Sequence, residues 1–300
     1  MSLFVRRSHQ SPLWLSLRSC SQKKEKKKVE PPKLDEPLGR EIYRENQVVR
    51  LVLNSPKNRN ALSLELMKTL REELSQIDKI NKVRAVILAG EGPAFSAGHD
   101  LRQLTDENGF SKHVEIFSEC TKLMSLIRAM QLPVIAEVNG IASAAGCQLV
   151  STCDVVIASE ESHFSVPGLK VGLFCSTPGI PLGRSINDKL AMDMLLTARS
   201  IKANEALRAG LVSRVVPSEQ VKFEALKVAE EICKMSRSVT ALGKAFYYAQ
   251  KEMKLADAYR FGEKVMTENL KLKDCQEGID AFIEKRPATW THSDDRVGQE

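Results

Sequence analysis

The chain has 300 residues, of which 43% are hydrophobic and 27% charged, so its composition is that of a folded globular protein and not of a disordered one. No apolar run reaches the roughly 18 residues that a membrane-spanning helix needs. The formal charge of +6 suggests nucleic acid as a partner, but eight basic residues and only one acidic residue fall within residues 1–28. The rest of the chain carries 36 basic and 37 acidic residues, which argues against nucleic-acid binding.

The N-terminal segment has the composition of a targeting sequence. Residues 1–24 contain no acidic residue and are rich in Arg and Ser, which is typical of a mitochondrial presequence. A secretory signal is disfavoured because the apolar run at residues 12–17 is short and is interrupted by Ser16. We therefore expect residues 1–37 to be a targeting presequence and linker, and the protein to reach the mitochondrial matrix.

The next part of the chain alternates between strand and helix patterns. Short apolar runs flanked by turn-forming residues predict strands at residues 47–53, 84–89, 134–138 and 154–158. Ser63 can cap a helix whose apolar residues recur every three or four positions, and a second helix is predicted at residues 111–130. This alternation indicates an α/β fold with buried parallel strands.

Beyond Pro217 the pattern becomes wholly helical. The predicted helices are residues 218–236, 239–253, 256–272 and 274–285. We therefore expect an α/β core over residues 38–220 and a helical region over residues 221–300.

Common cofactor and metal signatures are missing from the sequence. The seven cysteines are scattered without a C-x-x-C pair, and the five histidines form no H-x-x-x-H pattern, so neither disulfides nor a metal site are predicted. Neither a G-x-G-x-x-G turn nor a P-loop occurs, so no nucleotide cofactor is predicted.

Two turns of small residues, at residues 92–102 and 139–149, each follow an apolar strand. Small residues let a ligand approach the backbone, where unpaired N–H groups can bind an oxyanion. They also permit tight packing of a helix on a strand. Each turn taken alone leaves both interpretations open.

Five motifs in the same order along the chain resemble those of the crotonase superfamily, whose best-known members are enoyl-CoA hydratases. The motifs are SPKNRNAL at 55–62, FSAGHDL at 95–101, PVIAEVNG at 133–140, CDV at 153–155 and EGIDAFIEKR at 277–286. The resemblance covers roughly residues 40–290 and implies a crotonase-like spiral of ββα units followed by a C-terminal helical trimerisation region. It also implies trimers that often pair into hexamers, and an acyl-CoA thioester as ligand, with coenzyme A bound as part of the substrate and no separate cofactor.

The resemblance further implies roles for individual residues. In the family two backbone N–H groups hold the thioester oxygen as it becomes an enolate, and the matching positions here are His99 and Ala145. Asp100 would also cap the helix that follows it, and Lys285 would reach the coenzyme A of a neighbouring subunit. The implied substrate and CoA-binding residues are Lys57, Ala97, Asp100, Leu101, Arg102 and Lys285.

The chain departs from the family where a hydratase carries its two glutamates. Gln148 stands in place of the first, and Gly168 in place of the second. A glutamine cannot exchange protons near neutral pH and a glycine has no side chain, whereas a positioned acid or base typically contributes about 10²–10⁴ in rate. Residues 172–179 also differ from the family pattern, so we expect a remodelled acyl pocket.

The sequence therefore predicts an acyl-CoA-binding crotonase homologue of mitochondrial fatty-acid and lipid metabolism, with little or no hydratase activity, and leaves open whether it is an enzyme. The alternative is an enzyme with other oxyanion-dependent chemistry, namely thioester hydrolysis, isomerisation or decarboxylation. His99 is then a candidate base because its ordinary pKa is near neutral, whereas Cys147 and Cys175 lack an activating base. RNA binding, known in some crotonase homologues, is disfavoured because the helix after Ser63 alternates in charge.

Overall fold

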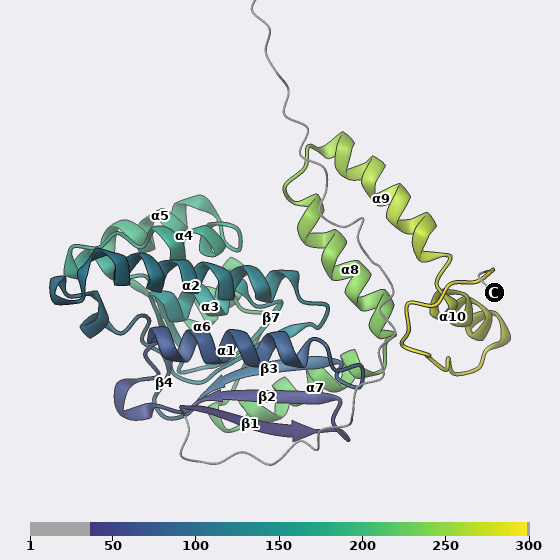
Figure 1. Ribbon diagram of the computed structural model, residues 1–300, viewed down its shortest axis with the longest axis horizontal. Coiled ribbons are helices and arrows are strands. Elements are labelled where there is room, and N and C mark those ends of the chain that lie inside the picture. Colours follow the sequence, from purple (N-terminus) through teal and green to yellow (C-terminus); the bar gives the residue numbers. More distant parts are fainter. Residues whose placement is uncertain (1–36, 299–300) are drawn as a thin grey trace, which may run out of the picture. The chain divides into compact units, whose positions relative to one another are not determined.

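The computed structural model describes residues 37–298, so the predicted presequence, but for Pro37 at the end of its linker, lies outside the described residues. Within this range the chain forms two sheets and a series of helices (Figure 1). The strands are β1 (Leu38–Tyr43), β2 (Val48–Leu53), β3 (Ala85–Gly90), β4 (Ala94–Ser96), β5 (Val134–Val138), β6 (Ile141–Ser143), β7 (Val155–Ser159), β8 (His163–Ser165), β9 (Ser200–Lys202) and β10 (Arg214–Val216). The α-helices are α1 (Leu64–Ile77), α2 (Gly109–Ala129), α3 (Ala145–Thr152), α4 (Ser176–Gly183), α5 (Asp188–Thr197), α6 (Ala203–Ala209), α7 (Val221–Cys233), α8 (Arg237–Gln250), α9 (Leu255–Asn269) and α10 (Lys273–Glu284).

The chain passes repeatedly between the two sheets. The larger sheet has the strand order β1-β2-β3-β5-β7-β10, in which β1 is antiparallel to β2 and all other neighbours are parallel. In the smaller sheet, of order β4-β6-β8-β9, the first three strands are parallel. Because β4, β6 and β8 directly follow β3, β5 and β7, each pair of strands is one turn of the spiral that the sequence predicts.

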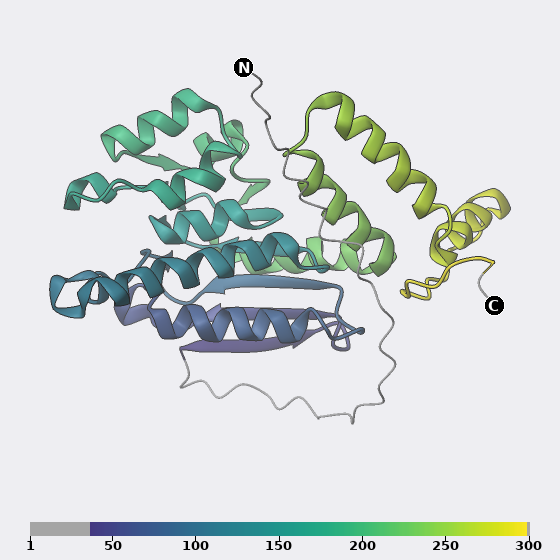
Figure 2. The ribbon, with the colours of Figure 1, turned by 45° about the horizontal axis from the view of Figure 1, so that its top comes forward.

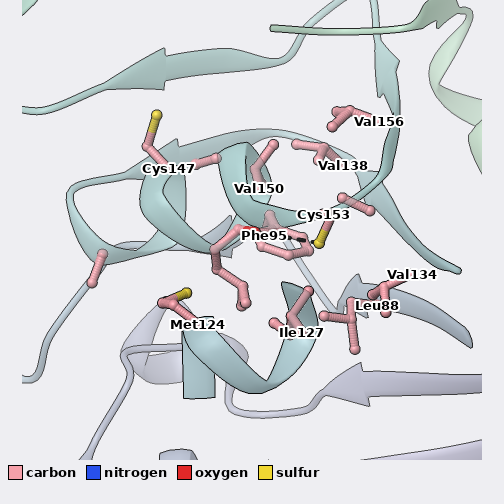
Figure 3. Packing of buried hydrophobic residues seen from close by; sticks show 14 of the residues in the cluster. Leu88, Phe95, Met124, Ile127, Val134, Val138, Cys147, Val150, Cys153 and Val156 are labelled. Carbon is pink, nitrogen blue, oxygen red and sulfur yellow. Dashed lines mark hydrogen bonds between the residues drawn. The ribbon is translucent and has the colours of Figure 1, made fainter. Parts of the chain in front are cut away.

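Helices cover both faces of the larger sheet. On one face α1 and α2 lie side by side, as Figure 2 shows, and the largest hydrophobic core lies beneath them. In Figure 3, Met124 and Ile127 of α2 face Val150 of α3 across this core, with Phe95 between the two helices. On the other face a smaller cluster packs Ile87 and other strand residues against α7.

The sequence locates most of these elements correctly. As predicted, the Ser63 hydroxyl accepts a hydrogen bond from the Leu66 N–H (3.1 Å) and so caps α1, whose buried face carries the apolar residues of the periodic pattern. The four predicted strands are confirmed as β2, β3, β5 and β7, and the four C-terminal helices as α7 to α10. The edge strands β1 and β10, the three-residue strands of the smaller sheet and helices α4, α5 and α6 were not predicted, and α2 begins two residues earlier than predicted.

An ion pair with a buried lysine is one of the contacts that fasten helix α8 to the α/β core. The Lys244 ammonium group donates to a carboxylate oxygen of Asp154 (2.7 Å) and to the carbonyls of Ile127 and Leu132 (both 2.9 Å). The other oxygen of Asp154 accepts from the Tyr248 hydroxyl (2.7 Å), and burial, together with the neighbouring carboxylate, raises the pKa of Tyr248. All donors of Lys244 are therefore used inside the protein.

No helix among residues 37–298 combines the length and the apolar character needed to cross a bilayer.

Replacing Lys244 by Met should lower the free energy of unfolding by about 3 kcal/mol, because it leaves the Asp154 carboxylate without its buried counter-charge. Chemical denaturation monitored by circular dichroism measures this change. The same replacement of Lys264, which is exposed on α9, should shift stability by no more than about 0.5 kcal/mol. Equal effects of the two replacements would show that the ion pair does not hold α8 in place.

Candidate functional site

The candidate site lies at one edge of the smaller sheet. Strands β4, β6 and β8 are parallel neighbours, so their carboxyl ends lie along the same edge. The turns that leave these ends contain His99, Ala145 and Gly168. The topology thus brings together three positions that lie 23 to 69 residues apart in the chain.

The first two turns are in direct contact through Gly98. Gly98 has a φ of +97°, and a Cβ atom there would lie 2.8 Å from the Ala144 Cβ and 3.1 Å from the Ala145 nitrogen. Gly146 is equally crowded, because a Cβ atom would lie 2.4 Å from the Ser96 carbonyl oxygen. Only glycine at these two positions lets the backbones approach so closely.

Two backbone N–H groups are left available where the turns meet. Ala145 is the first residue of α3, so its N–H has no acceptor within the helix, and Ala144 before it has a φ of +49°. In the other turn the Leu62 N–H donates to the Gly98 carbonyl (2.7 Å). This hydrogen bond does not use the His99 N–H. Neither N–H donates to a backbone acceptor between residues 37 and 298. Two such donors can stabilise one developing oxyanion.

Asn60, which the sequence analysis did not single out, connects the loop before α1 to the first turn. Its side-chain oxygen accepts from the Ser55 N–H (2.8 Å), and its amide group donates to the carbonyls of Glu91 (2.9 Å) and Ala94 (2.7 Å). The backbone carbonyl of Asn60 accepts a hydrogen bond from the Ser96 hydroxyl (2.8 Å). Asn60 is completely buried, so it acts as a positioning residue. The sequence signal that could have identified Asn60 is an asparagine in a turn, within the first motif that carries the family resemblance.

Gln148 lies in the first turn of α3, three residues after Ala145. Its side chain is buried, and its carbonyl oxygen accepts a weak hydrogen bond from the Cys120 thiol of α2 (3.8 Å). A carboxamide here can bind and orient polar groups, but it cannot serve as a proton donor or base near neutral pH.

Gly168 has no room for any side chain. A Cβ atom at this position would lie 2.0 Å from the Leu173 carbonyl oxygen and 2.8 Å from the Cys175 sulfur. The Gly168 N–H donates to that sulfur (3.3 Å), and the Gly168 carbonyl accepts from the Leu173 N–H (2.9 Å). The loop of residues 168–175 therefore folds into the space that a glutamate side chain at position 168 would need.

The buried carboxylates of the described chain have partners elsewhere. There are three among residues 37–298: Glu119, Glu137 and Asp274. Glu119 pairs with Arg71, and Glu137 makes two hydrogen bonds of 2.7 Å to Arg50. Asp274 accepts hydrogen bonds from Ser236 and from residues 291 and 292. All three buried carboxylates therefore have partners within the described part of the chain.

Three other side chains of the site have shifted pKa values. Burial lowers the pKa of His99, so its imidazole is neutral at physiological pH. The His99 ring packs edge-on against Phe117 of α2, with the ring centroids 5.2 Å apart. Burial raises the pKa of Cys147 to about 12 and raises that of Cys175, so both thiols stay protonated and are poor nucleophiles.

The predicted CoA-binding residues differ in how free their side chains are. Asp100 caps the short 3₁₀ helix Leu101–Leu104 by accepting from the Arg102 N–H (3.1 Å), which confirms the predicted cap. Its two oxygens also accept from the Arg102 guanidinium (2.9 and 2.8 Å), so this exposed arginine already has a partner. Leu101 is 54% exposed.

The remaining predicted binding residues lie on other loops. The Ala97 N–H donates to the Arg59 carbonyl (2.9 Å) and so is used inside the protein. Lys57 is exposed in a short 3₁₀ helix, and Lys285 is exposed where α10 ends, with a φ of +54°. No group of His, Cys, Asp and Glu side chains within the described range is arranged to hold a metal ion.

Comparisons with known proteins agree with this geometry. A model of the enoyl-CoA hydratase/isomerase family matches residues 43–293. "Enoyl-CoA hydratase domain-containing protein 3, mitochondrial" from Xenopus laevis is 48% identical over 252 residues, which are 84% of this chain and 86% of the relative. Its Homo sapiens counterpart is 48% identical over 242 residues, 81% of this chain and 80% of the relative.

Solved structures show the same likeness. The crystal structure of human enoyl-CoA hydratase domain-containing protein 3 has a TM-score of 0.83 and 45% identity, covering 85% of this chain and 100% of that chain. The Mycobacterium smegmatis enoyl-CoA hydratase has a TM-score of 0.83 and 39% identity, covering 85% and 99%. Within the superfamily the sequence motifs indicate a likeness to mitochondrial enoyl-CoA hydratase domain-containing protein 3, and these comparisons confirm it.

Replacing Gly168 by Ala should destabilise the protein by about 3 kcal/mol, because even a methyl group overlaps the Leu173 carbonyl. Gly183, at the end of α4, offers a matched control, since a Cβ atom there meets nothing within 4 Å. Gly183→Ala should leave stability unchanged or raise it by up to about 1 kcal/mol. If thermal melting gives both variants the same stability, position 168 has room for a side chain.

Proposed function

Because the chain belongs to the enoyl-CoA hydratase/isomerase family, we propose that it binds acyl-CoA thioesters in mitochondria and has little or no enoyl-CoA hydratase activity. The observation that carries the second half of the proposal is the closed backbone around Gly168. The protein needs no cofactor apart from the coenzyme A of its ligand.

The binding half of the proposal is supported by the two turns that meet at Gly98 and Ala145. The thioester oxygen binds to the N–H groups of His99 and Ala145, which no other backbone acceptor of the described chain uses. Fixed donors of this kind favour the enolate over the neutral thioester, and one such donor is typically worth about 3–4 kcal/mol to a transition state. The site can therefore stabilise negative charge on the ligand oxygen.

The same site lacks the means to move protons in a hydration reaction. Gln148 and Gly168 occupy the positions of the two family glutamates, and the buried carboxylates of residues 37–298 are paired with other groups. Loss of one positioned acid or base typically lowers the rate about 10²–10⁴-fold. Binding without hydration is the expected behaviour.

Coenzyme A is held mainly by cationic side chains. Lys57 and Lys285 are exposed, and Arg102 offers the outer face of a guanidinium that Asp100 orients. Ala97 and Leu101 contribute the backbone and an apolar side chain beside the first turn.

The relatives at 45–48% identity are named as mitochondrial, and residues 1–24 have the composition of a transit peptide. The protein is therefore a mitochondrial one whose presequence is removed on import, and an acyl-CoA ligand places it in fatty-acid and lipid metabolism.

Assembly into trimers, or pairs of trimers, is supported by apolar residues on the C-terminal helices. Leu255 and Tyr259 of α9 are each 74% exposed, and Met266 follows on the same face of this helix. Phe282 of α10 is 85% exposed. Large exposed apolar side chains at helical spacing are typical of an interface with another subunit.

Catalysis of a reaction other than hydration, namely thioester hydrolysis, isomerisation or decarboxylation, is a second candidate function. One observation favours it. His99 has an imidazole, which can accept a proton as the Gln148 amide cannot, while burial lowers the pKa of this ring. Assaying several acyl-CoA thioesters for turnover distinguishes this candidate from a protein that only binds such thioesters.

The wild-type protein should bind butyryl-CoA in calorimetry, while hydration of crotonyl-CoA stays at least about 100-fold below that of an ordinary family hydratase. Ala145→Pro removes one of the two N–H donors and should abolish binding. If that variant unfolds at a lower temperature than the wild type, replacing Ala145 by its α-hydroxy analogue is the second test, because this removes the same N–H with less strain. Absence of any CoA-ester binding contradicts the proposal, and fast hydration contradicts its second half. Cleavage of the thioester that depends on the Ala145 N–H supports the second candidate.

Light scattering after size-exclusion chromatography should give a mass of three or six chains for the protein lacking residues 1–36. Tyr259→Asp should shift this mass toward the monomer, because a charge would be buried in the interface. Lys264→Asp, on another face of α9, serves as the control and should leave the mass unchanged. A monomeric wild-type protein would contradict the proposed assembly.

A further inference from the structure

Ala144, the residue immediately before the proposed oxyanion donor Ala145, has a backbone conformation that alanine rarely adopts. Its φ is +49° and its ψ is −118°, which lies outside the small left-handed region open to residues with a side chain. This combination is typical of glycine at the first central position of a type II′ turn. Strained residues of this kind persist only where the surrounding structure holds them, and they are concentrated at functional sites.

Two hydrogen bonds hold the backbone of Ala144 in this conformation. Its N–H donates to the Ser165 carbonyl at the end of β8 (2.9 Å), and its carbonyl accepts from the Gln148 N–H in the first turn of α3 (3.0 Å). Because a peptide group is planar and trans, an Ala144 carbonyl that points along α3 turns the Ala145 N–H the opposite way, out of the helix N-terminus. The direction of the oxyanion donor is therefore set by the conformation of Ala144.

A pair of serine hydroxyls fastens the same strand ends. Ser143 of β6 and Ser165 of β8 are direct partners in the parallel register, and the Ser165 hydroxyl donates to the Ser143 hydroxyl (3.0 Å). Both side chains are half-buried, on the face of the smaller sheet opposite to the completely buried Ala142 and Phe164. Ser165 is thus joined to the second turn twice, through its carbonyl to Ala144 and through its hydroxyl to Ser143.

The strain at Ala144 has a defined direction of release. An alanine freed from the Ser165 carbonyl relaxes to a negative φ, the range that residues with a Cβ atom prefer. This change rotates the peptide groups on either side of it, so the Ala145 N–H no longer meets the His99 N–H at one oxygen. Glycine has no such preference, and with glycine at position 144 the turn would keep its shape without help.

We propose that Ser143 and Ser165 are positioning residues of the oxyanion site. Their hydroxyl pair keeps β8 against β6 and so holds Ala144 in the strained conformation that aims the Ala145 N–H at the thioester oxygen. This inference rests on the proposed function, because the N–H has an oxygen to be aimed at only if the site binds a thioester. Both serines act through Ala144 and not on the ligand itself.

The test couples Ser165 to the residue at position 144. In titration calorimetry, Ser165→Ala should bind butyryl-CoA about 3- to 10-fold more weakly than the wild type, the equivalent of one net hydrogen bond. In an Ala144→Gly background the same replacement should change the affinity by less than about 2-fold, since glycine adopts the turn without the serine pair. A serine that only supports the sheet would cause the same loss in both backgrounds, and that result overturns the proposal.

Ser200→Ala is the matched control. Ser200 of β9 is the partner of Ser165 on its other side, and its hydroxyl donates to the Phe164 carbonyl (3.3 Å) and not to the second turn. Its loss should leave the affinity for butyryl-CoA unchanged, and a loss as large as that of Ser165→Ala overturns the proposal. Ser165→Thr keeps a hydroxyl and should bind within about 2-fold of the wild type.

The carbonyl carbon of the ligand gives a second readout. With butyryl-CoA labelled with ¹³C at the thioester carbonyl, binding should move this signal downfield, because two N–H donors polarise the C=O bond. At saturating ligand the shift should be smaller in Ser165→Ala than in the wild type. An unchanged shift in Ser165→Ala overturns the positioning role and leaves the proposed function intact, whereas failure of the wild-type protein to bind butyryl-CoA overturns both.

Discussion

The close approach of Gly98 to Ala144 and Ala145 is the constraint on which the site depends. Two turns from separate strands can present their N–H groups to one oxygen only if no side chain stands between them. The rest of the local structure serves this contact. Asn60 holds the first turn from outside, and Gly146 lets the start of α3 press against Ser96. The parallel pairing of β4 with β6 then brings the two turns to the same edge of the smaller sheet.

The proposed loss of the two family glutamates differs in kind at the two positions. At position 148 the change is chemical, because glutamine fills much the same space as glutamate but does not ionise near neutral pH. At position 168 the change is structural, because the Leu173 carbonyl and the Cys175 thiol occupy the space of a side chain. Any side chain introduced at position 168 by a single substitution would clash with the Leu173 carbonyl. The loop and the glycine therefore depend on each other, and the proposed site has no carboxylate at this position.

Much of the fold follows from local patterns, while the site depends on contacts that such patterns do not encode. The buried parallel strands and α1 were predicted because apolar runs and the Ser63 cap are strong short-range signals. Strands β4, β6 and β8 have three residues each, too few to show any periodicity, and they exist because their neighbours in the spiral pair with them. The resemblance identified positions 99, 145, 148 and 168. The space around Gly168 depends on residues distant in sequence, so only the structure reveals it.

The distribution of charge connects ligand binding with assembly. The chain beyond residue 28 is nearly neutral, so an anionic CoA ester must be held by a few local cations. Arg102 is partly neutralised by Asp100, which leaves Lys57 on the core and Lys285 at the end of α10 as the exposed cations of the predicted set without an ion pair among residues 37–298. Lys285 lies next to the exposed Phe282, on the surface proposed to pack against another subunit. If that lysine contacts the ligand of a neighbouring subunit, part of the free energy of ligand binding comes from a contact across the subunit interface. The assembled protein then binds CoA esters more tightly than its monomer, and by mass action the ligand stabilises the assembly to the same extent.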